Sequence, residues 1–347
     1  MPLLTILHQL PFKKALAWVT IALVSACVTP YEADFKQQPE SVVVQGFISN
    51  EPGPYIVQLV RPANYSFQGY SIGIQGAKVY ITDDVGERED LVETRDIGQY
   101  KTLKLQGITG RTYQLHFEID GKKYESKPEL LREAVAIDHI YHEPFRSIDP
   151  ITKERQLGGW HVYVDTQDPD ERGNYYRWTA MHYKYLLTTC TDCWDIVRCL
   201  GPDCIKVAND ALNNGRKIAR QEVATVPVEC RNKYYLEVEQ QALSREGYLY
   251  FKTIKQLLEN TGGVFDVTPS AVPGNMSCLT DPDEQVLGLF GAVGITRVGY
   301  VVDRSNAERA ACPPVLPYLP PGGIPPPCIP CVESLYRTGQ KPRFWDL

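Results

Sequence analysis

Residues 112–126, with the sequence TYQLHFEIDGKKYES, decide the fold class of this chain. Apolar or aromatic side chains alternate with polar ones over the first eight positions, which predicts a half-buried β-strand. Asp120 and Gly121 then suit the two-residue turn of a hairpin, and residues 123–126 return as its second strand. The side chains on the buried face of the first strand are Tyr113, Leu115, Phe117 and Ile119.

Further short strands are predicted before this hairpin. Residues 41–48 are rich in valine, and residues 55–59 alternate after a turn that contains Pro52 and Gly53. Residues 77–82 lead into another turn at Asp83 and Gly86. Several short strands at this spacing predict an immunoglobulin-like β-sandwich over residues 41–127.

Residues 134–347 predict a larger β-rich domain with one main helix. Ser244 is the expected N-cap of this helix, and Tyr248, Phe251 and Leu258 follow helical spacing before Gly262. Such an aromatic stripe is typical of core packing. Strands are expected at residues 135–141, 160–165, 174–187, 233–242, 286–293 and 296–302.

The cysteines of the second domain indicate disulfide-stapled loops, above all in a cysteine-rich insertion near residues 188–230. Two Cys-x-x-Cys pairs, one at 190–193 and one at 328–331, could instead form a four-cysteine zinc site. Disulfides are the expected state in an exported chain. The candidates are Cys190, Cys193, Cys199, Cys204, Cys230, Cys278, Cys312, Cys328 and Cys331.

The N-terminus predicts a lipoprotein signal peptide over residues 1–26. Lys13 and Lys14 precede an apolar segment, 15–26, that is shorter than the ~20 residues of a membrane-spanning helix. This segment ends in Leu23-Val24-Ser25-Ala26-Cys27, a lipobox pattern. We expect cleavage before Cys27 and lipidation of its thiol, followed by a tether over residues 27–40. An ordinary secretory signal is the alternative.

Charge argues against nucleic acid as a partner. The full chain of 347 residues carries a net charge of −6, and removal of Lys13 and Lys14 with the signal peptide lowers it to −8. Surfaces that bind nucleic acid are normally basic. The chain has 21 tyrosines, which fits β-structure with long loops and also a surface for binding.

No motif for catalysis stands out. The zinc-protease, phosphate-loop and dinucleotide-binding patterns are missing from the sequence. Residues 69–73 fit G-x-S-x-G, but the expected flanks are loop and strand, where a nucleophile elbow needs strand and helix. The acidic stretch 165–173 departs from the spacing of a calcium loop. We therefore predict no catalytic residue, no cofactor and no metal.

Short motifs of glycine and aromatic residues are spread over the mature chain. They lie at residues 43–48, 51–55, 76–79, 98–100, 110–115, 262–265, 273–276 and 287–290. These motifs resemble the Bacteroidota outer-membrane lipoprotein family called domain of unknown function 4249. The resemblance implies a fold and a location more than a chemistry. Glu32 and Asp34 after Cys27 also resemble the acidic signal that sends such lipoproteins to the cell surface.

Two functions remain open at this stage. Relatives in the resembled family are often encoded beside TonB-dependent transporters of the SusC type. This implies a non-catalytic outer-membrane lipoprotein that captures ligand for a β-barrel transporter or a similar assembly, held to the membrane through Cys27. Tyr65, Phe67 and Tyr70 are the candidate contact residues. The alternative is a surface hydrolase acting on glycans or peptides.

Overall fold

The structure is a computed structural model that describes residues 41–62, 71–186, 190–199, 201–229, 234–260, 272–305, 322 and 328–346. Glu40–Leu347 form one compact unit. The predicted signal peptide 1–26 and tether 27–40 lie outside the described residues. The prediction of a mainly β fold with one main helix is confirmed.

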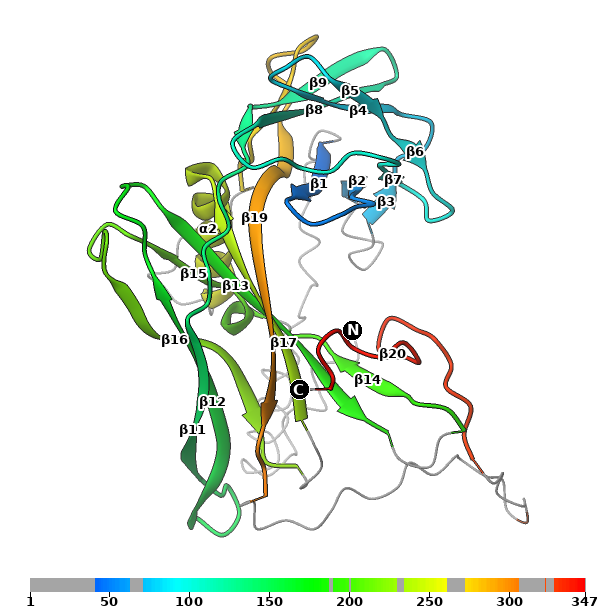
Figure 1. Ribbon diagram of the computed structural model, residues 1–347. Coiled ribbons are helices and arrows are strands. Elements are labelled where there is room, and N and C mark those ends of the chain that lie inside the picture. Colours follow the sequence, from blue (N-terminus) through cyan, green and yellow to red (C-terminus); the bar gives the residue numbers. More distant parts are fainter. Residues whose placement is uncertain are drawn as a thin grey trace, which may run out of the picture. The chain divides into compact units, whose positions relative to one another are not determined.

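The largest sheet contains eleven of the described strands. They are β1 (Val42–Ser49), β2 (Ile56–Pro62), β3 (Ser71–Gly73), β6 (Val92–Glu93), β7 (Gln99–Lys101), β13 (Tyr175–Tyr185), β14 (Trp194–Val197), β15 (Lys206–Asn209), β17 (Tyr234–Leu243), β19 (Val286–Val302) and β20 (Arg337–Thr338). Their order is β20-β14-β13-β17-β19-β1-β2-β7-β6, with β15 beside β13 and β3 beside β2 (Figure 1).

Strand β19 belongs to both halves of this sheet. Its first part, as far as Val293, pairs in parallel with β1. From Gly294 onward it pairs antiparallel with β17. The two strands predicted at 286–293 and 296–302 are therefore one continuous strand, and that prediction is wrong. Gly294 lies within the strand and pairs with Ala242 of β17. A glycine is needed there because another segment of the chain crosses directly over it and leaves no room for a side chain.

A second sheet of six described strands is built around the stretch that the sequence singles out. The strand at residues 112–119 is confirmed, with the predicted alternation of buried side chains, and Asp120 and Gly121 have the positive φ angles of the predicted turn. The strands are β4 (Lys78–Asp83), β5 (Arg88–Asp90), β8 (Thr112–Ile119), β9 (Lys122–Ser126), β10 (Glu129–Leu130) and β18 (Met276–Cys278), ordered β18-β9-β8-β4-β5 with β10 beside β8.

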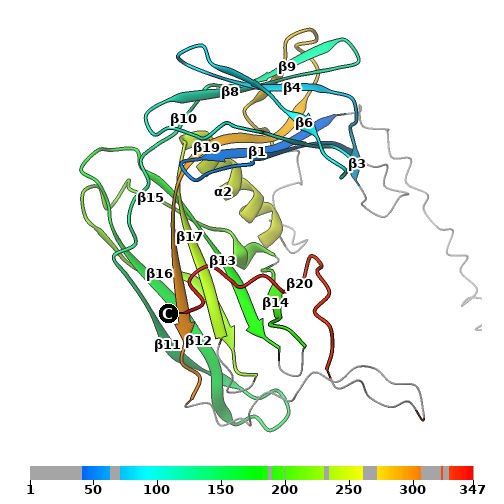
Figure 2. The same cartoon turned by 45° about the vertical axis from the view of Figure 1, so that its right-hand side comes forward.

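The first core lies between β1, β2 and β7 on one side and β4, β8 and β9 on the other. Leu59 and Leu115 are fully buried at its centre, and Figure 2 shows the two layers stacked. The immunoglobulin-like detail predicted for residues 41–127 is not confirmed, because β18 and β19, from residues 276–302, complete this sandwich. Sequence order gives no sign of such a return.

The second core lies between the large sheet and a third, three-stranded sheet. The third sheet is made of β11 (His139–Ile148), β12 (Arg155–Gln167) and β16 (Lys217–Pro227). Trp160 of β12 and Tyr176 and Trp178 of β13 are among its fully buried side chains. Ladders of Trp, Tyr and Val on facing strands fill this core, as β-propensity predicts.

Helix α2 (Arg245–Glu259) is confirmed, with Ser244 as the N-cap: the Ser244 hydroxyl accepts a hydrogen bond from Gly247 N at 3.1 Å. Tyr248 and Phe251 are buried against Leu243 of β17 and against β19. No helix in the described part of the chain is long and apolar enough to cross a bilayer.

Candidate functional site

The two cores are joined by residues 131–138, which we call the connector. The connector runs without turn or bend and crosses β19 at Gly294. A Cβ atom at Gly294 would lie 2.4 Å from Arg132 O and 2.7 Å from Ala134 N. Only glycine therefore lets the connector backbone approach β19 this closely.

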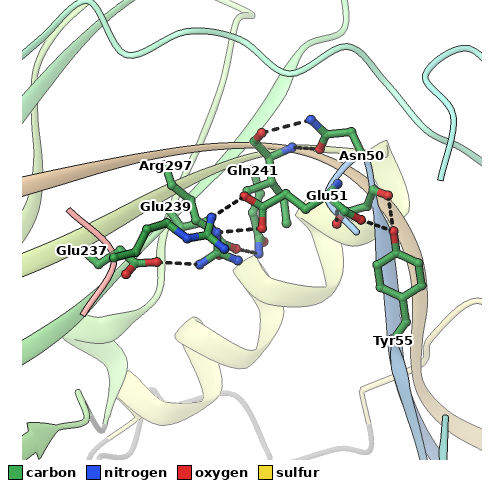
Figure 3. Close-up of polar contacts among 10 residues, drawn as sticks. Asn50, Glu51, Tyr55, Glu237, Glu239, Gln241 and Arg297 are labelled. Atoms are coloured by element: carbon green, nitrogen blue, oxygen red, sulfur yellow. Dashed lines mark hydrogen bonds and ion pairs between the residues drawn. The ribbon is translucent and has the colours of Figure 1, made fainter. Parts of the chain in front are cut away.

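Asn50 fixes the end of β1 at the same crossing. Its Nδ2 donates to Ile295 O at 3.2 Å, and its Oδ1 accepts from Ile295 N at 2.7 Å (Figure 3). The carboxamide thus takes the place of one further peptide unit of β1. At the point where β19 changes its pairing partner, the Asn50 side chain is hydrogen-bonded to β19, and the connector packs closely against it.

A cavity of about 550 Å³, which we call the junction pocket, lies along the connector. This volume falls within the ~300–1,000 Å³ typical of small-molecule sites. Tyr175 and Tyr176 of β13 are among its lining residues, and the ring of Tyr175 packs against Tyr248 of α2, with ring centroids 5.2 Å apart. The pocket is lined by residues 109–110, 130–135, 169, 171, 174–176 and 242.

Three charged residues line the junction pocket: Arg132, Glu133 and Glu171. None of them has an ion pair in the described ranges, and both acids are exposed to solvent. The Nε of Arg132 is buried and has no hydrogen-bond partner among the described residues. An unpartnered buried guanidinium N–H costs free energy unless a ligand or water satisfies it. This makes Arg132 the group around which a ligand would be recognised.

Two buried carboxylates hold the wall opposite the connector. Asp168 is 1% exposed, accepts a hydrogen bond from Gly215 N at 3.0 Å, and also accepts from the Tyr176 hydroxyl. Asp210 accepts from Gly173 N at 2.7 Å and from Asn174 N at 3.0 Å. These acids therefore bind backbone N–H groups, and they shape the loop that carries Glu171.

A second cavity, of about 670 Å³, is less suited to a charged ligand because most of its charged side chains already have partners among the described residues. Arg111 Nη1 lies 2.7 Å from Asp83 Oδ2. Glu89 accepts hydrogen bonds from the backbone N–H groups of Leu103 and Lys104. The junction pocket is therefore the stronger candidate.

A cluster of ion pairs around Arg297 ties β1, β17 and β19 together (Figure 3). The guanidinium lies 2.9 Å from Glu51 Oε2, 3.2 Å from Glu237 Oε1 and 2.6 Å from Glu239 Oε2. Arg343, from the C-terminal segment, binds the other oxygen of Glu51 at 2.9 Å. Four distant parts of the chain thus meet at one carboxylate-rich point.

This cluster does not have the arrangement of a glycosidase acid pair. A glycosidase needs one carboxyl group that can give a proton to the leaving group. Glu237 and Glu239 are both engaged by the same guanidinium, so neither is free for that role. Burial raises the pKa of Glu129 to about 7, but Glu129 is 2% exposed and bonded to Asn275 inside the first core.

The disulfides hold the C-terminal segment against the edge of the large sheet. Cys190 pairs with Cys328 and Cys193 with Cys331, so the two Cys-x-x-Cys motifs cross-link each other. Cys199 pairs with Cys204 inside the insertion. Trp345, beyond the double cross-link, packs against Trp194, Tyr235 and Tyr185, with ring centroids 5.5–5.9 Å apart.

Several predicted site residues lie outside the described residues. These are Cys27, the candidate contact residues Tyr65, Phe67 and Tyr70, and the cysteines Cys230 and Cys312. Cys278 is described, buried and unpaired with another cysteine. No group of three or more His, Cys, Asp or Glu side chains suited to a metal occurs in the ranges that the structure covers.

Sequence reasoning missed the residues that matter most in the junction pocket. Arg132 lies in an unremarkable run, LLREAVAI, and nothing in its spacing signals a site. Glu171 was part of the acidic stretch 165–173, whose Asp168 turns out to be buried and structural. Only the proximity of residues far apart in the sequence identifies the pocket.

Comparison with protein-family models matches residues 28–298 to the model described as Domain of unknown function (DUF4249). The resemblance seen in the sequence is therefore confirmed over most of the chain. Comparison with curated proteins finds no match.

Proposed function

Because this chain belongs to the family described as Domain of unknown function (DUF4249), we propose from the junction pocket that it is a non-catalytic ligand-capture lipoprotein. It acts at the outer membrane as an accessory of a TonB-dependent, SusC-like transporter or a similar assembly. The observation that carries the proposal is a pocket of ligand size lined by Arg132, whose buried Nε has no partner among the described residues.

The geometry supports binding more than hydrolysis. The acids of the Arg297 cluster are engaged in ion pairs, and Asp168 and Asp210 hold backbone N–H groups. The junction pocket instead offers a guanidinium that has no partner in the described part of the chain, a group that can orient a ligand without a nucleophile.

The lipobox that ends at Cys27 supports membrane attachment. Acyl chains contribute roughly 0.8 kcal/mol for each methylene buried in the bilayer, so two or more chains anchor a protein stably. A tethered binding domain raises the local concentration of its ligand near a transporter. Intact-mass measurement of the N-terminal peptide tests the anchor, and Cys27→Ser should abolish the added acyl mass.

Affinity purification of the native lipoprotein from detergent-solubilised outer membrane tests the transporter role. We expect mass spectrometry to find a TonB-dependent β-barrel in near-stoichiometric amount. If the lipoprotein is recovered alone, the accessory role is wrong. Assays for cleavage of glycans and peptides then test the hydrolase alternative.

A further inference from the structure

The C-terminal segment, residues 328–346, is bound to the large sheet at its edge. Two disulfides join it to the residues just before β14. Its strand β20 is two residues long and pairs with β14, Arg337 opposite Asp195 and Thr338 opposite Trp194. So short a ladder adds few main-chain hydrogen bonds to the two covalent links.

Most apolar side chains of the C-terminal segment face solvent. The most exposed of them, at 61–67%, are Val332, Leu335 and Tyr336. Trp345 is different, because its ring packs edge-on against Trp194 and Tyr235, with centroids 5.5 and 5.6 Å apart. This one aromatic contact buries little surface to offset the conformational entropy that is lost when the whole segment is ordered.

The ion pairs of the segment lie near the surface. Arg337 Nε is 2.7 Å from Asp195 Oδ1, and the arginine side chain is 32% exposed. Arg343 Nη1 is 2.9 Å from Glu51 Oε1, and this arginine is 54% exposed. Exposed ion pairs contribute little to stability. The disulfides therefore hold the segment in place more than its other contacts do.

The two disulfides differ in their exposure to solvent. The first, Cys190–Cys328, which we call the outer disulfide, has one exposed and one half-buried cysteine. The second, Cys193–Cys331, which we call the inner disulfide, includes Cys193 at 0% exposure. Thiol–disulfide exchange requires a thiolate to reach a sulfur atom, so the outer disulfide reacts first.

We propose that these disulfides form a two-stage redox latch on the C-terminal segment. A dithiol reductant first reduces the outer disulfide: two electrons and two protons pass to its sulfurs, and the dithiol becomes a disulfide. The segment stays in place because the inner disulfide still holds it. A second dithiol then reduces the inner disulfide in the same way, and the segment leaves the sheet.

Release of the segment uncovers a surface for interaction. Trp194 and Tyr235, 1% and 0% exposed beneath Trp345, lose part of their cover, and β14 loses its pairing with β20. An unpaired strand edge beside apolar side chains is suited to pairing with another extended segment. The docked C-terminal segment blocks this surface. The inference is independent of the ligand-capture function, because the latch shares no residue with the junction pocket.

A time course of reduction of the full lipoprotein by dithiothreitol, in detergent micelles under nitrogen, tests the latch. Each sample receives a short pulse of trypsin and is then alkylated, and mass spectrometry identifies the alkylated cysteines and the peptide bonds that were cut. The diagnostic bond follows Arg337, inside β20. We expect alkylation of the outer pair while this bond stays intact, and cleavage only when the inner pair is alkylated.

Paired serine substitutions separate the two stages. Without the inner disulfide, cleavage after Arg337 should shift to the earlier stage, when the outer disulfide is reduced. Without the outer disulfide, cleavage should keep the later time of the wild type. Replacing Cys199 and Cys204 by serine is the matched control, because this disulfide does not involve the C-terminal segment, and neither stage should change.

Four results would overturn the latch. The first is cleavage after Arg337 in the oxidised protein, and the second is reduction of both disulfides at the same rate. The third is a bond that stays intact after both are reduced, because the other contacts then suffice. The fourth is cleavage in oxidised Trp345→Ala, which would show that the Trp345 contact holds the segment.

Discussion

Arg297 Nε and Glu51 Oε2 lie 2.9 Å apart although 246 residues separate them in the sequence. Glu51 follows β1 in the first half of the unit, and Arg297 lies on β19 just after the change of partner at Gly294. The same guanidinium binds Glu237 and Glu239. One side chain therefore connects the first core to the sheet of the second.

Arg297→Met should destabilise the protein by about 2–4 kcal/mol. The substitution leaves Glu237 and Glu239 side by side, 11% and 12% exposed, without their shared counter-ion. Removing one partner of a buried ion pair costs ~3–5 kcal/mol, and partial exposure reduces this figure. Denaturant titration measures the change in unfolding free energy.

Arg343→Met is the matched control for Arg297→Met. Arg343 binds the same Glu51, but its side chain is 54% exposed, so we expect a change of at most ~1 kcal/mol. Equal effects of the two substitutions would contradict the central role of Arg297.

We expect loss of either long-range disulfide alone to change stability little, whereas loss of both should destabilise the protein strongly. Each joins residues 138 apart, and either alone closes nearly the same loop. Replacing Cys190 and Cys328 by serine should therefore cost little. Replacing all four cysteines should cost about 5 kcal/mol, the loop-closure entropy expected at this length.

Replacing Cys199 and Cys204 by serine provides the comparison. They are only 5 residues apart, so the same relation gives about 2 kcal/mol for their loss. Thermal melting of the three variants measures the differences. Strictly additive losses from the two long-range pairs would argue against a shared loop.

Stability should fall in acid because of His182. Burial lowers the pKa of His182 to about 4 from 6.5, with a smaller effect from Lys184. Between these values the unfolded chain binds a proton that the folded chain does not, so stability falls as pH drops from 6.5 to 4. The full loss is about 3 kcal/mol.

His182→Gln tests this pH dependence. Its carbonyl can still accept from the Tyr234 hydroxyl, which lies 2.9 Å from His182 Nδ1. We expect the variant to lose less stability than the wild type between pH 6.5 and 4, by urea titration at several pH values. Parallel curves for the two proteins would exclude His182 as the cause.

Glu129 should lower stability as pH rises, which is the opposite of the pH dependence expected from His182. Burial raises its pKa to about 7 from 4.5, so the folded chain keeps a proton that the unfolded chain has lost between these values. Stability therefore falls as pH rises through this window, by up to about 3 kcal/mol. Glu129→Gln should match the wild type at pH 4 and exceed it at pH 8. Glu118→Gln is the control. The Glu118 side chain is 35% exposed, so we expect this substitution to leave stability unchanged at both pH values.

Local sequence signals predicted the strands, turns and caps that are determined by residues close together in the chain. The alternation in β8, its Asp120-Gly121 turn and the Ser244 cap of α2 each depend on neighbouring residues, and all three are confirmed. The parallel pairing of β1 with β19 depends on segments more than 200 residues apart. No local pattern encodes that pairing, so the first sandwich could not be completed from sequence.

The candidate site could not be predicted from the sequence either, because it also brings together segments that are far apart in the chain. The junction pocket takes its walls from four separate stretches, and what marks Arg132 is a buried Nε without a hydrogen-bond partner among the described residues. The sequence predicted separate strands at 286–293 and 296–302, with Gly294 between them, where the structure has the single strand β19. Gly294 is the point where the connector crosses β19.

Gly294→Ala should therefore affect both stability and the junction pocket. Its Cβ would meet backbone atoms, Arg132 O at 2.4 Å and Ala134 N at 2.7 Å, which cannot move as a side chain does. We expect a loss of about 1–3 kcal/mol of unfolding free energy, as for other overpacked sites, and a displacement of residues 132–134 along the pocket.

Gly247→Ala, in the first turn of α2, is the matched control for Gly294→Ala. There the nearest atom to a new Cβ is Ser244 Oγ at 3.4 Å, an ordinary contact, and alanine favours a helix by roughly 0.5–1 kcal/mol. The same substitution should thus stabilise at one glycine and destabilise at the other. If Gly294→Ala melts like the wild type, the connector does not depend on its close approach to β19.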